Sequence, residues 1–129
     1  MSQVKIYGLK KSISPIRRPI SEAIHQCVVE TLKLPADKRF HRFILLDEED
    51  FIFPPSRSDH YLIIEIMMLT GRQIETRKQL IKRLFEEISH RTGISTTDIE
   101  VCILESPAAN WGFRGMTGDE GSLTYSIDT

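Results

Sequence analysis

The chain has 129 residues, of which 40% are hydrophobic and 27% are charged, and its formal net charge at pH 7 is −1. This length favours one domain with one hydrophobic core. The 17 lysines and arginines are scattered along the chain, so we expect no nucleic acid partner, because such partners are bound by a concentrated basic face.

The sequence also gives expectations about compartment. No apolar run reaches membrane-spanning length, and the first residues do not resemble a secretory signal. Cys27 and Cys102 have neither metal-ligand nor redox spacing. We therefore expect a cytoplasmic protein without a membrane partner, in which both thiols are reduced and buried.

The first half of the chain predicts a strand, a helix and a second strand. Residues 3–9 form a strand, and residues 39–46 form the next one. The helix between them begins either at Ser14, with Pro15 in its first position, or near Pro19, because a proline inside a helix removes a hydrogen bond. Its apolar face consists of Ile20, Ala23, Ile24, Cys27, Val28 and Thr31.

The second half repeats this pattern. Residues 61–69 are almost continuously apolar, which is typical of a strand buried on both faces. A tight turn containing Arg72 leads to a helix that ends at Gly93, and residues 99–105 form a fourth strand. Residues 51–55 are a loop or short edge strand, because they contain two prolines. The expected helix face consists of Ile74, Arg77, Ile81, Leu84, Phe85 and Ile88.

Two βαβ units, at about residues 1–58 and 59–105, predict an α/β fold of the α+β type. We expect one four-stranded mixed sheet with both helices on the same face, within a single domain that spans residues 1–129. Because the other face of such a sheet is apolar and uncovered, we also expect an oligomer.

The segment after the fourth strand is rich in glycine and contains the chain's one tryptophan, Trp111, with Phe113 and Arg114 beside it. It matches neither a collagen repeat nor a phosphate-binding loop. We interpret it as a loop that places an aromatic wall at a pocket or a subunit seam, and residues 123–127 as a last edge strand.

Arg72 is the first functional candidate. A helix start offers unpaired N–H groups and the positive end of the helix dipole, so a guanidinium fixed there makes an anion site of the size of a carboxylate. The alternative is a surface arginine paired with Glu75 or another acid.

These features together resemble the tautomerase superfamily. The strand at the amino terminus, the duplicated βαβ pattern, the sequence TGRQIETRK at 70–78 and the Asn-Trp-Gly-Phe loop at 110–113 carry the resemblance, which covers residues 2–127. It is closest to the branch with both βαβ units in one polypeptide, such as malonate semialdehyde decarboxylase-like and 4-oxalocrotonate tautomerase-like proteins.

The resemblance implies a homotrimer with pockets between or beside its subunits. It also implies chemistry on small carbonyl acids without a metal or organic cofactor: proton transfer next to a carbonyl, decarboxylation or hydration. In that family an amino-terminal proline acts as base or acid, and an arginine at the position of Arg72 grips the substrate.

The chain departs from the family pattern at two positions. Ser2 occupies the place of the proline, so removal of Met1 would expose a primary amine with a reference pKa of about 7.7 to 8.0, able to take a proton or form an imine. Lys38 occupies the place of the acid found in decarboxylase-like members, with Asp37 one residue earlier.

We therefore predict a tautomerase-like isomerase or lyase whose partner is a small 2-keto or enol carboxylate. Ser2 and Arg72 are the expected catalytic residues, and Arg72, Trp111, Phe113 and Lys38 are the expected substrate-binding residues. Three alternatives remain: a non-catalytic trimer that binds a ligand or serves as a scaffold, imine chemistry at Lys38, and purely structural roles for these side chains. We assign no role to the four histidines and no metal site.

Overall fold

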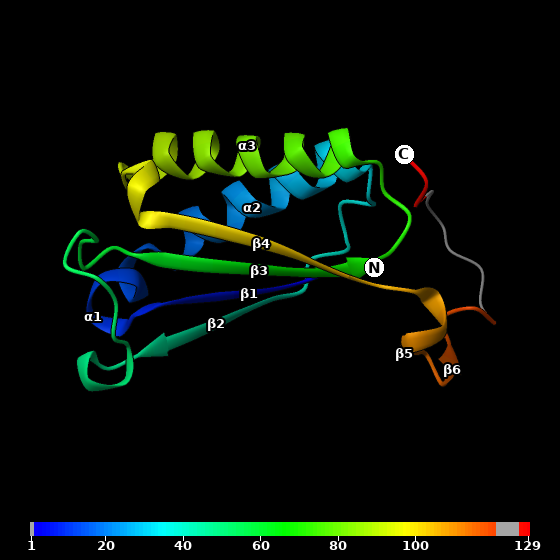
Figure 1. The fold of residues 1–129 in the computed structure, drawn as a ribbon, viewed down its shortest axis with the longest axis horizontal. Coiled ribbons are helices and arrows are strands. Elements are labelled where there is room, and N and C mark those ends of the chain that lie inside the picture. The colour runs from blue at the N-terminus through cyan, green and yellow to red at the C-terminus, as the bar shows by residue number, and fades with distance from the viewer. Residues whose placement is uncertain (1, 121–126) are drawn as a thin grey trace.

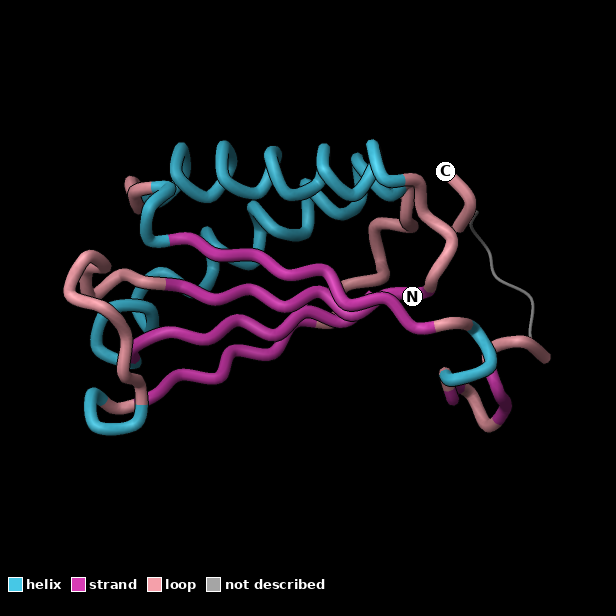
Figure 2. The backbone as a smooth tube through the Cα atoms, in the orientation of Figure 1, coloured by secondary structure: helices cyan, strands magenta, loops and turns pink. Residues whose placement is uncertain are grey.

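The structure, a computed structural model, describes residues 2–120 and 127–129. Four strands form one sheet, and two long helices cover one side of it (Figures 1 and 2). The elements of the first half are β1 (Ser2–Leu9), α1 (Lys10–Ile13), α2 (Arg17–Leu32) and β2 (His41–Leu46). Those of the second half are β3 (Leu62–Leu69), α3 (Ile74–Thr92) and β4 (Ile99–Ser106), followed by the short strands β5 (Gly112–Phe113) and β6 (Met116–Thr117).

The order of strands in the sheet is β2-β1-β3-β4. β1 and β2 are parallel, β3 and β4 are parallel, and the central pair β1 and β3 is antiparallel. Each parallel pair is connected by one long helix, as parallel strands require. The predicted duplicated βαβ architecture, with a mixed sheet and both helices on one face, is confirmed.

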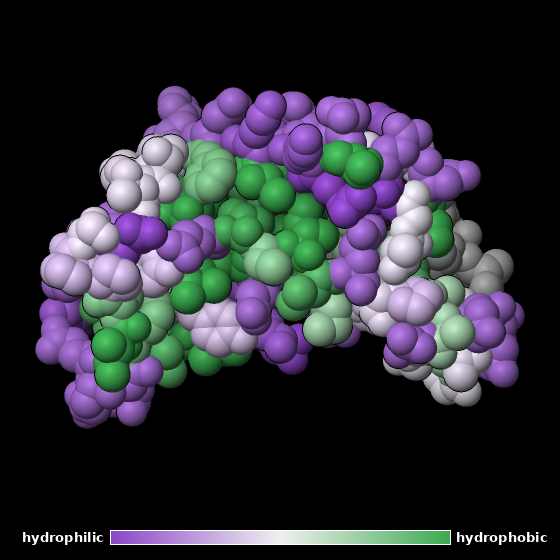
Figure 3. Space-filling model, in the orientation of Figure 1, coloured by the Kyte–Doolittle hydropathy of each residue, from purple (hydrophilic) through white to green (hydrophobic). Residues whose placement is uncertain are grey.

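The core lies between the sheet and the helices. Along β1 and β3 the residues that face the helices are buried and alternate with partly exposed ones, as the two-residue period of a strand dictates. Figure 3 shows the polar outer surface of the helices and apolar residues gathered over the strand layer below them. The most deeply buried side chains include Ile6, Ile20, Ile24, Leu62, Ile64, Ile66, Leu80, Leu84 and Ile88.

Two burial predictions are wrong for the isolated chain. The third strand is not buried on both faces, because Ile63, Glu65 and Met67 point away from the helices and are partly exposed. Cys27 is buried, but Cys102 is exposed because it lies on the outer face of β4.

The helix boundaries settle which start of the first helix is right. α2 begins at Arg17, so Pro19 is its third residue, where an amide hydrogen has no intrahelical acceptor to lose. Ser14 forms no side-chain cap; it starts the 3-10 turn Ser14–Ile16. In α3, Ile74 is 58% exposed and does not join the predicted apolar face, whereas Leu80 is fully buried.

The remaining segments are loops and short turns. Residues 51–55 are a loop without strand pairing. Residues 123–126 of the predicted last strand lie outside the described residues, and Ile127 is part of a bend. In the described part of the chain, no helix is long and apolar enough to cross a membrane.

Candidate functional site

One end of the sheet collects the predicted site residues. β1 begins there with Ser2, which pairs with Met68 near the end of the antiparallel β3. β4 also ends there, with Ser106 beside Leu69. The start of the chain, the junction between β3 and α3, and the segment after β4 therefore lie close together, as Figure 1 shows.

A single carbonyl group connects two of these segments. The oxygen of Ser106 accepts a hydrogen bond from the backbone N–H of Thr70 at 3.0 Å and another from the indole Nε1–H of Trp111 at 3.0 Å. Thr70 lies two residues before Arg72. The indole is thus anchored to the end of β4 through the same carbonyl that holds the backbone just before Arg72.

Arg72 is a buried residue, not a surface one, since it is only 7% exposed. Its Nη1 donates to the carbonyl oxygen of Leu32 at 2.6 Å and to Oγ1 of Thr129 at 3.0 Å. Burial lowers the pKa of the guanidinium, and the nearby charge of Asp128 opposes this effect. An arginine in such a place still carries its charge at neutral pH. Within the described residues it forms no ion pair with Glu75.

Ser2 lies at the inner side of the sheet and is 5% exposed. Its row across the strands continues through Met68 to Glu105, which is paired with Met68. Oε1 of Glu105 lies 3.3 Å from Nη1 of Arg77. In the described part of the chain, Nε of Arg77 and Oε2 of Glu105 have no hydrogen-bond partner although both atoms are buried. No sequence pattern indicates this ion pair, because only the strand register places Glu105 in the row of Ser2.

Trp111 and Phe113 have different surroundings. Trp111 is 8% exposed and is enclosed by its own loop, where Gly118 donates its N–H to the Trp111 carbonyl at 2.8 Å. Phe113 lies on the hairpin of β5 and β6, which projects beyond the sheet in Figure 1. The guanidinium of Arg114 lies 5.1 Å from the centre of its ring. A hollow of about 420 Å³ beside the hairpin is lined by Gly112, Phe113, Gly115, Met116, Thr117 and Glu120.

Lys38 lies on the other side of β1. It is partly buried, and its backbone N–H donates to the carbonyl of Pro35 in a turn before β2. In the sheet β1 lies between β2, which follows Lys38 in the chain, and β3, which precedes Arg72. Asp37, the neighbouring acid, is exposed.

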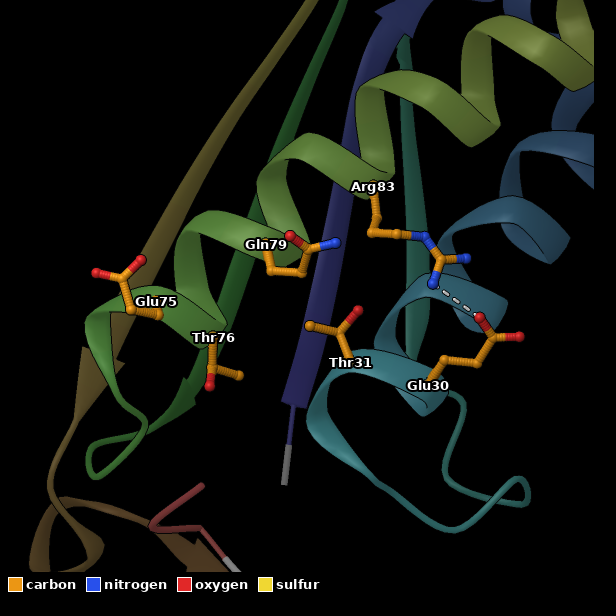
Figure 4. Close-up of a pocket in the computed structure, with 6 residues that line it drawn as sticks. All are labelled: Glu30, Thr31, Glu75, Thr76, Gln79 and Arg83. Atoms are coloured by element: carbon orange, nitrogen blue, oxygen red, sulfur yellow. Dashed lines mark ion pairs between the residues drawn. The ribbon is translucent and has the colours of Figure 1, made fainter.

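A groove of about 450 Å³ separates the last turn of α2 from the first turns of α3 (Figure 4). In Figure 4 the side chains of Gln79 and Arg83 extend toward α2, where Arg83 forms an ion pair of 2.8 Å with Glu30. At the start of α3, the hydroxyl of Thr76 donates to the backbone oxygen of Thr129 at 2.6 Å. The lining residues are Glu30, Thr31, Glu75, Thr76, Gln79 and Arg83.

A serine and histidine pair is the second feature that the sequence did not reveal. Oγ of Ser21, on α2, lies 2.7 Å from Nδ1 of His41, the first residue of β2. Burial, followed by the charges of Arg39 and His25, lowers the pKa of His41 to about 4, so its ring is neutral at pH 7. The partners are 20 positions apart in the sequence and form no recognisable motif, so only the packing of α2 on β2 brings them together.

Among the described residues, no group of three or more histidine, cysteine, aspartate or glutamate side chains could hold a metal ion. What the sheet end offers chemically is the buried cation of Arg72, the hydroxyl of Thr76 and the anchored indole of Trp111. These groups suit the binding of a small anion.

Comparisons with known proteins agree with this architecture. A family model described as "Tautomerase enzyme" matches residues 38–114, which include Lys38, Arg72, Trp111 and Phe113. The protein named "Probable tautomerase YusQ" of Bacillus subtilis is 22% identical over 99 residues, covering 73% of this chain and 78% of that protein. The 2-hydroxymuconate tautomerase of Pseudomonas putida is 30% identical over 56 residues, covering 43% of this chain and 89% of that protein.

Solved structures give the same picture. The chain superposes on FG41 malonate semialdehyde decarboxylase inhibited by 3-bromopropiolate with a TM-score of 0.79 and 26% identity, covering 92% of this chain and 93% of the other. A fused 4-OT described as an asymmetric trimer gives a TM-score of 0.81 at 16% identity, with 92% and 97% covered. The second likeness concerns the fold alone.

Proposed function

The chain belongs to the tautomerase family, and from this membership we propose that it binds a small 2-keto or enol carboxylate and moves a proton next to the carbonyl group. The reaction is an isomerisation or a related decarboxylation. It proceeds without the amino-terminal proline, whose position Ser2 occupies.

The observation that carries this proposal is the environment of Arg72. A guanidinium that is 93% buried at the junction of β3 and α3 loses much of its hydration, and both hydrogen-bond acceptors of its Nη1 are neutral oxygens. A buried cation is stabilised best by an anion with two acceptor oxygens. A substrate carboxylate supplies these at the same end of the sheet as Ser2 and Trp111.

Each predicted residue has a role in this mechanism. Arg72 binds the carboxylate, and Lys38 adds positive charge on the other side of β1. Trp111 and Phe113 exclude water. The free amine of Ser2, present once Met1 is removed, accepts the enol proton, and its conjugate acid returns a proton to the neighbouring carbon, so that no net proton is consumed.

The active form in this proposal is a homotrimer that needs no cofactor. The face of the sheet opposite the helices carries Ile63, Met67 and Leu104, of which Leu104 is 42% exposed. Association would bury these side chains. The fused 4-OT relative with the same fold is described as a trimer, which supports this assembly.

A second candidate is a non-catalytic member of the family that keeps the pocket for ligand binding. It is favoured by Ser2, which lacks the ring nitrogen of proline and is 5% exposed within β1. In this case carboxylates bind at Arg72 but are not converted.

The test is the ketonisation of phenylenolpyruvate and 2-hydroxymuconate, followed by ultraviolet absorbance on tag-free protein. Arg72→Ala should lower kcat/KM by about 10- to 100-fold, because a charge-assisted hydrogen bond contributes about 1.5 to 3 kcal/mol. Arg18→Ala, which removes an exposed arginine from the first turn of α2, is the matched control and should have no effect.

Two results separate the candidates. Full activity in Arg72→Ala would remove this residue from the mechanism. Saturable binding of phenylpyruvate without turnover of either enol would reject the enzymatic proposal in favour of the non-catalytic one. Intact-mass spectrometry of the same sample would show whether Met1 is retained.

A further inference from the structure

Two side chains at the junction of β3 and α3 donate hydrogen bonds to the same residue. Nη1 of Arg72 donates to Oγ1 of Thr129 at 3.0 Å, and the hydroxyl of Thr76 donates to the backbone oxygen of Thr129 at 2.6 Å. Arg72 and Thr76 are 57 and 53 positions from Thr129 in sequence. The two donors therefore converge on a pair of oxygens that the distant part of the chain supplies.

Gly71 lets the same segment come close. Its φ is +141°, and a Cβ at this position would lie 2.8 Å from the backbone oxygen of Ile127. A side chain there would be both strained and in collision with this oxygen. Next along the segment, Asp128 places a negative charge near Arg72. Residues 127–129 thus lie across the junction with a carbonyl, a carboxylate and a hydroxyl, and Figure 1 shows this end of the chain beside the start of α3.

Nη1 of Arg72 and the hydroxyl of Thr76 have no hydrogen to spare in this arrangement. Nη1 of an arginine has two hydrogens, of which one goes to the carbonyl of Leu32 and the other to Thr129. A threonine hydroxyl has a single hydrogen, and that of Thr76 also goes to Thr129. A bound ligand can receive the second Nη1 hydrogen and the Thr76 hydrogen together only after Thr129 has left.

We propose that Arg72 and Thr76 form a two-donor site for a ligand carboxylate, and that residues 127–129 occupy this site as an internal competitor. This inference rests on the proposed carboxylate-binding function and adds Thr76 as a residue that determines specificity. Little of the segment is enclosed, because Ile127 and Thr129 are only partly buried and Asp128 is exposed.

The test measures binding of phenylpyruvate by isothermal titration calorimetry, with phenylacetone as the probe that lacks the carboxylate. Deletion of residues 127–129 should tighten phenylpyruvate binding by about tenfold, since a carboxylate no longer displaces two hydrogen bonds. Phenylacetone should be unaffected. In the shortened chain, Thr76→Val should weaken phenylpyruvate binding several-fold, and Thr76→Ser should restore it.

Thr31→Val is the matched control, because Thr31 lines the same groove from α2, whereas the hydroxyl that donates to Thr129 belongs to Thr76. Thermal unfolding followed by circular dichroism checks that each variant is folded. In the full chain, the NMR signals of residues 127–129 should shift toward random-coil positions as phenylpyruvate is added, a readout that needs no catalysis.

The possible outcomes are distinct. Equal phenylpyruvate affinity of the full and the shortened chain would overturn the competitor while leaving the carboxylate site intact. Equal tightening of phenylacetone would also overturn it, because the segment would then only block access. Absence of phenylpyruvate binding in both chains would reject the carboxylate function and this inference together.

Discussion

The neutral ring of His41 makes the stability of the protein depend on pH. The pKa of this imidazole is about 4 in the folded chain, against an ordinary value of 6.5, because the ring is removed from solvent beside Arg39 and His25. The unfolded chain therefore binds more protons than the folded chain between these values. The resulting stabilisation is complete above pH 6.5 and is lost as the pH falls through about 4.

The magnitude follows from the two pKa values. A fall from 6.5 to about 4 corresponds to roughly 3.4 kcal/mol at most. Because the side chain is partly exposed, solvent reduces this value and we expect about 2 kcal/mol. In the native chain, Oγ of Ser21 lies 2.7 Å from Nδ1 of His41. The variant His41→Asn keeps a polar amide close to Ser21, but this amide does not take up a proton in the pH range tested.

The assay is urea unfolding at closely spaced pH values from 7 to 4, followed by circular dichroism. The free energy of unfolding of the native chain should fall by about 2 kcal/mol more than that of His41→Asn over this range. The difference between the two curves removes the contribution of carboxylates, which titrate in both proteins. Parallel curves, or an NMR titration of His41 centred near 6.5, would refute the reasoning.

Two further predictions concern the segments that flank the sheet. Gly118→Ala should destabilise the chain by about 1 to 3 kcal/mol and raise the solvent exposure of the Trp111 indole, because the new Cβ would lie 2.5 Å from the backbone oxygen of Ala108; unchanged indole fluorescence and urea midpoint would contradict this. Asp98→Ala should cost about 3 kcal/mol, since this buried carboxylate accepts from the backbone N–H of Ser58 at 2.8 Å and from its hydroxyl at 2.5 Å. The exposed Asp59→Ala is its control in the same urea assay, and equal effects of the two variants would show that burial does not matter.

Local patterns were sufficient for most elements. The alternation along β1 and the spacing of Leu84 and Ile88 in α3 are periodicities of two and 3.6 residues, which report directly on which side of an element is buried. Gly93 ends α3 with φ at 78°, a conformation that glycine adopts without strain. Where the pattern failed, as at Ile74 and Cys102, the residue lies at a helix end or on the uncovered face, and a single chain provides nothing there to bury it.

The candidate site divides in the same way. The sequence pointed to Arg72 because a glycine and an arginine stand between a strand and an amphipathic helix, which is a local feature. It could not indicate that Thr129 accepts hydrogen bonds from both Arg72 and Thr76. Nor could it indicate that Ser21 contacts His41, or that Glu105 lies in the same row across the strands as Ser2. Each of these contacts joins residues that are far apart in the chain.

The sequence by itself determined the two βαβ units, because periodicity, glycine and proline act within a few residues. The tertiary structure decided the environment of each functional group: Arg72 is buried, Cys102 is exposed and His41 is neutral. The physical reason is that desolvation and hydrogen-bond partners depend on which elements pack together. That arrangement is fixed by strand order and register, which no local pattern of side chains specifies.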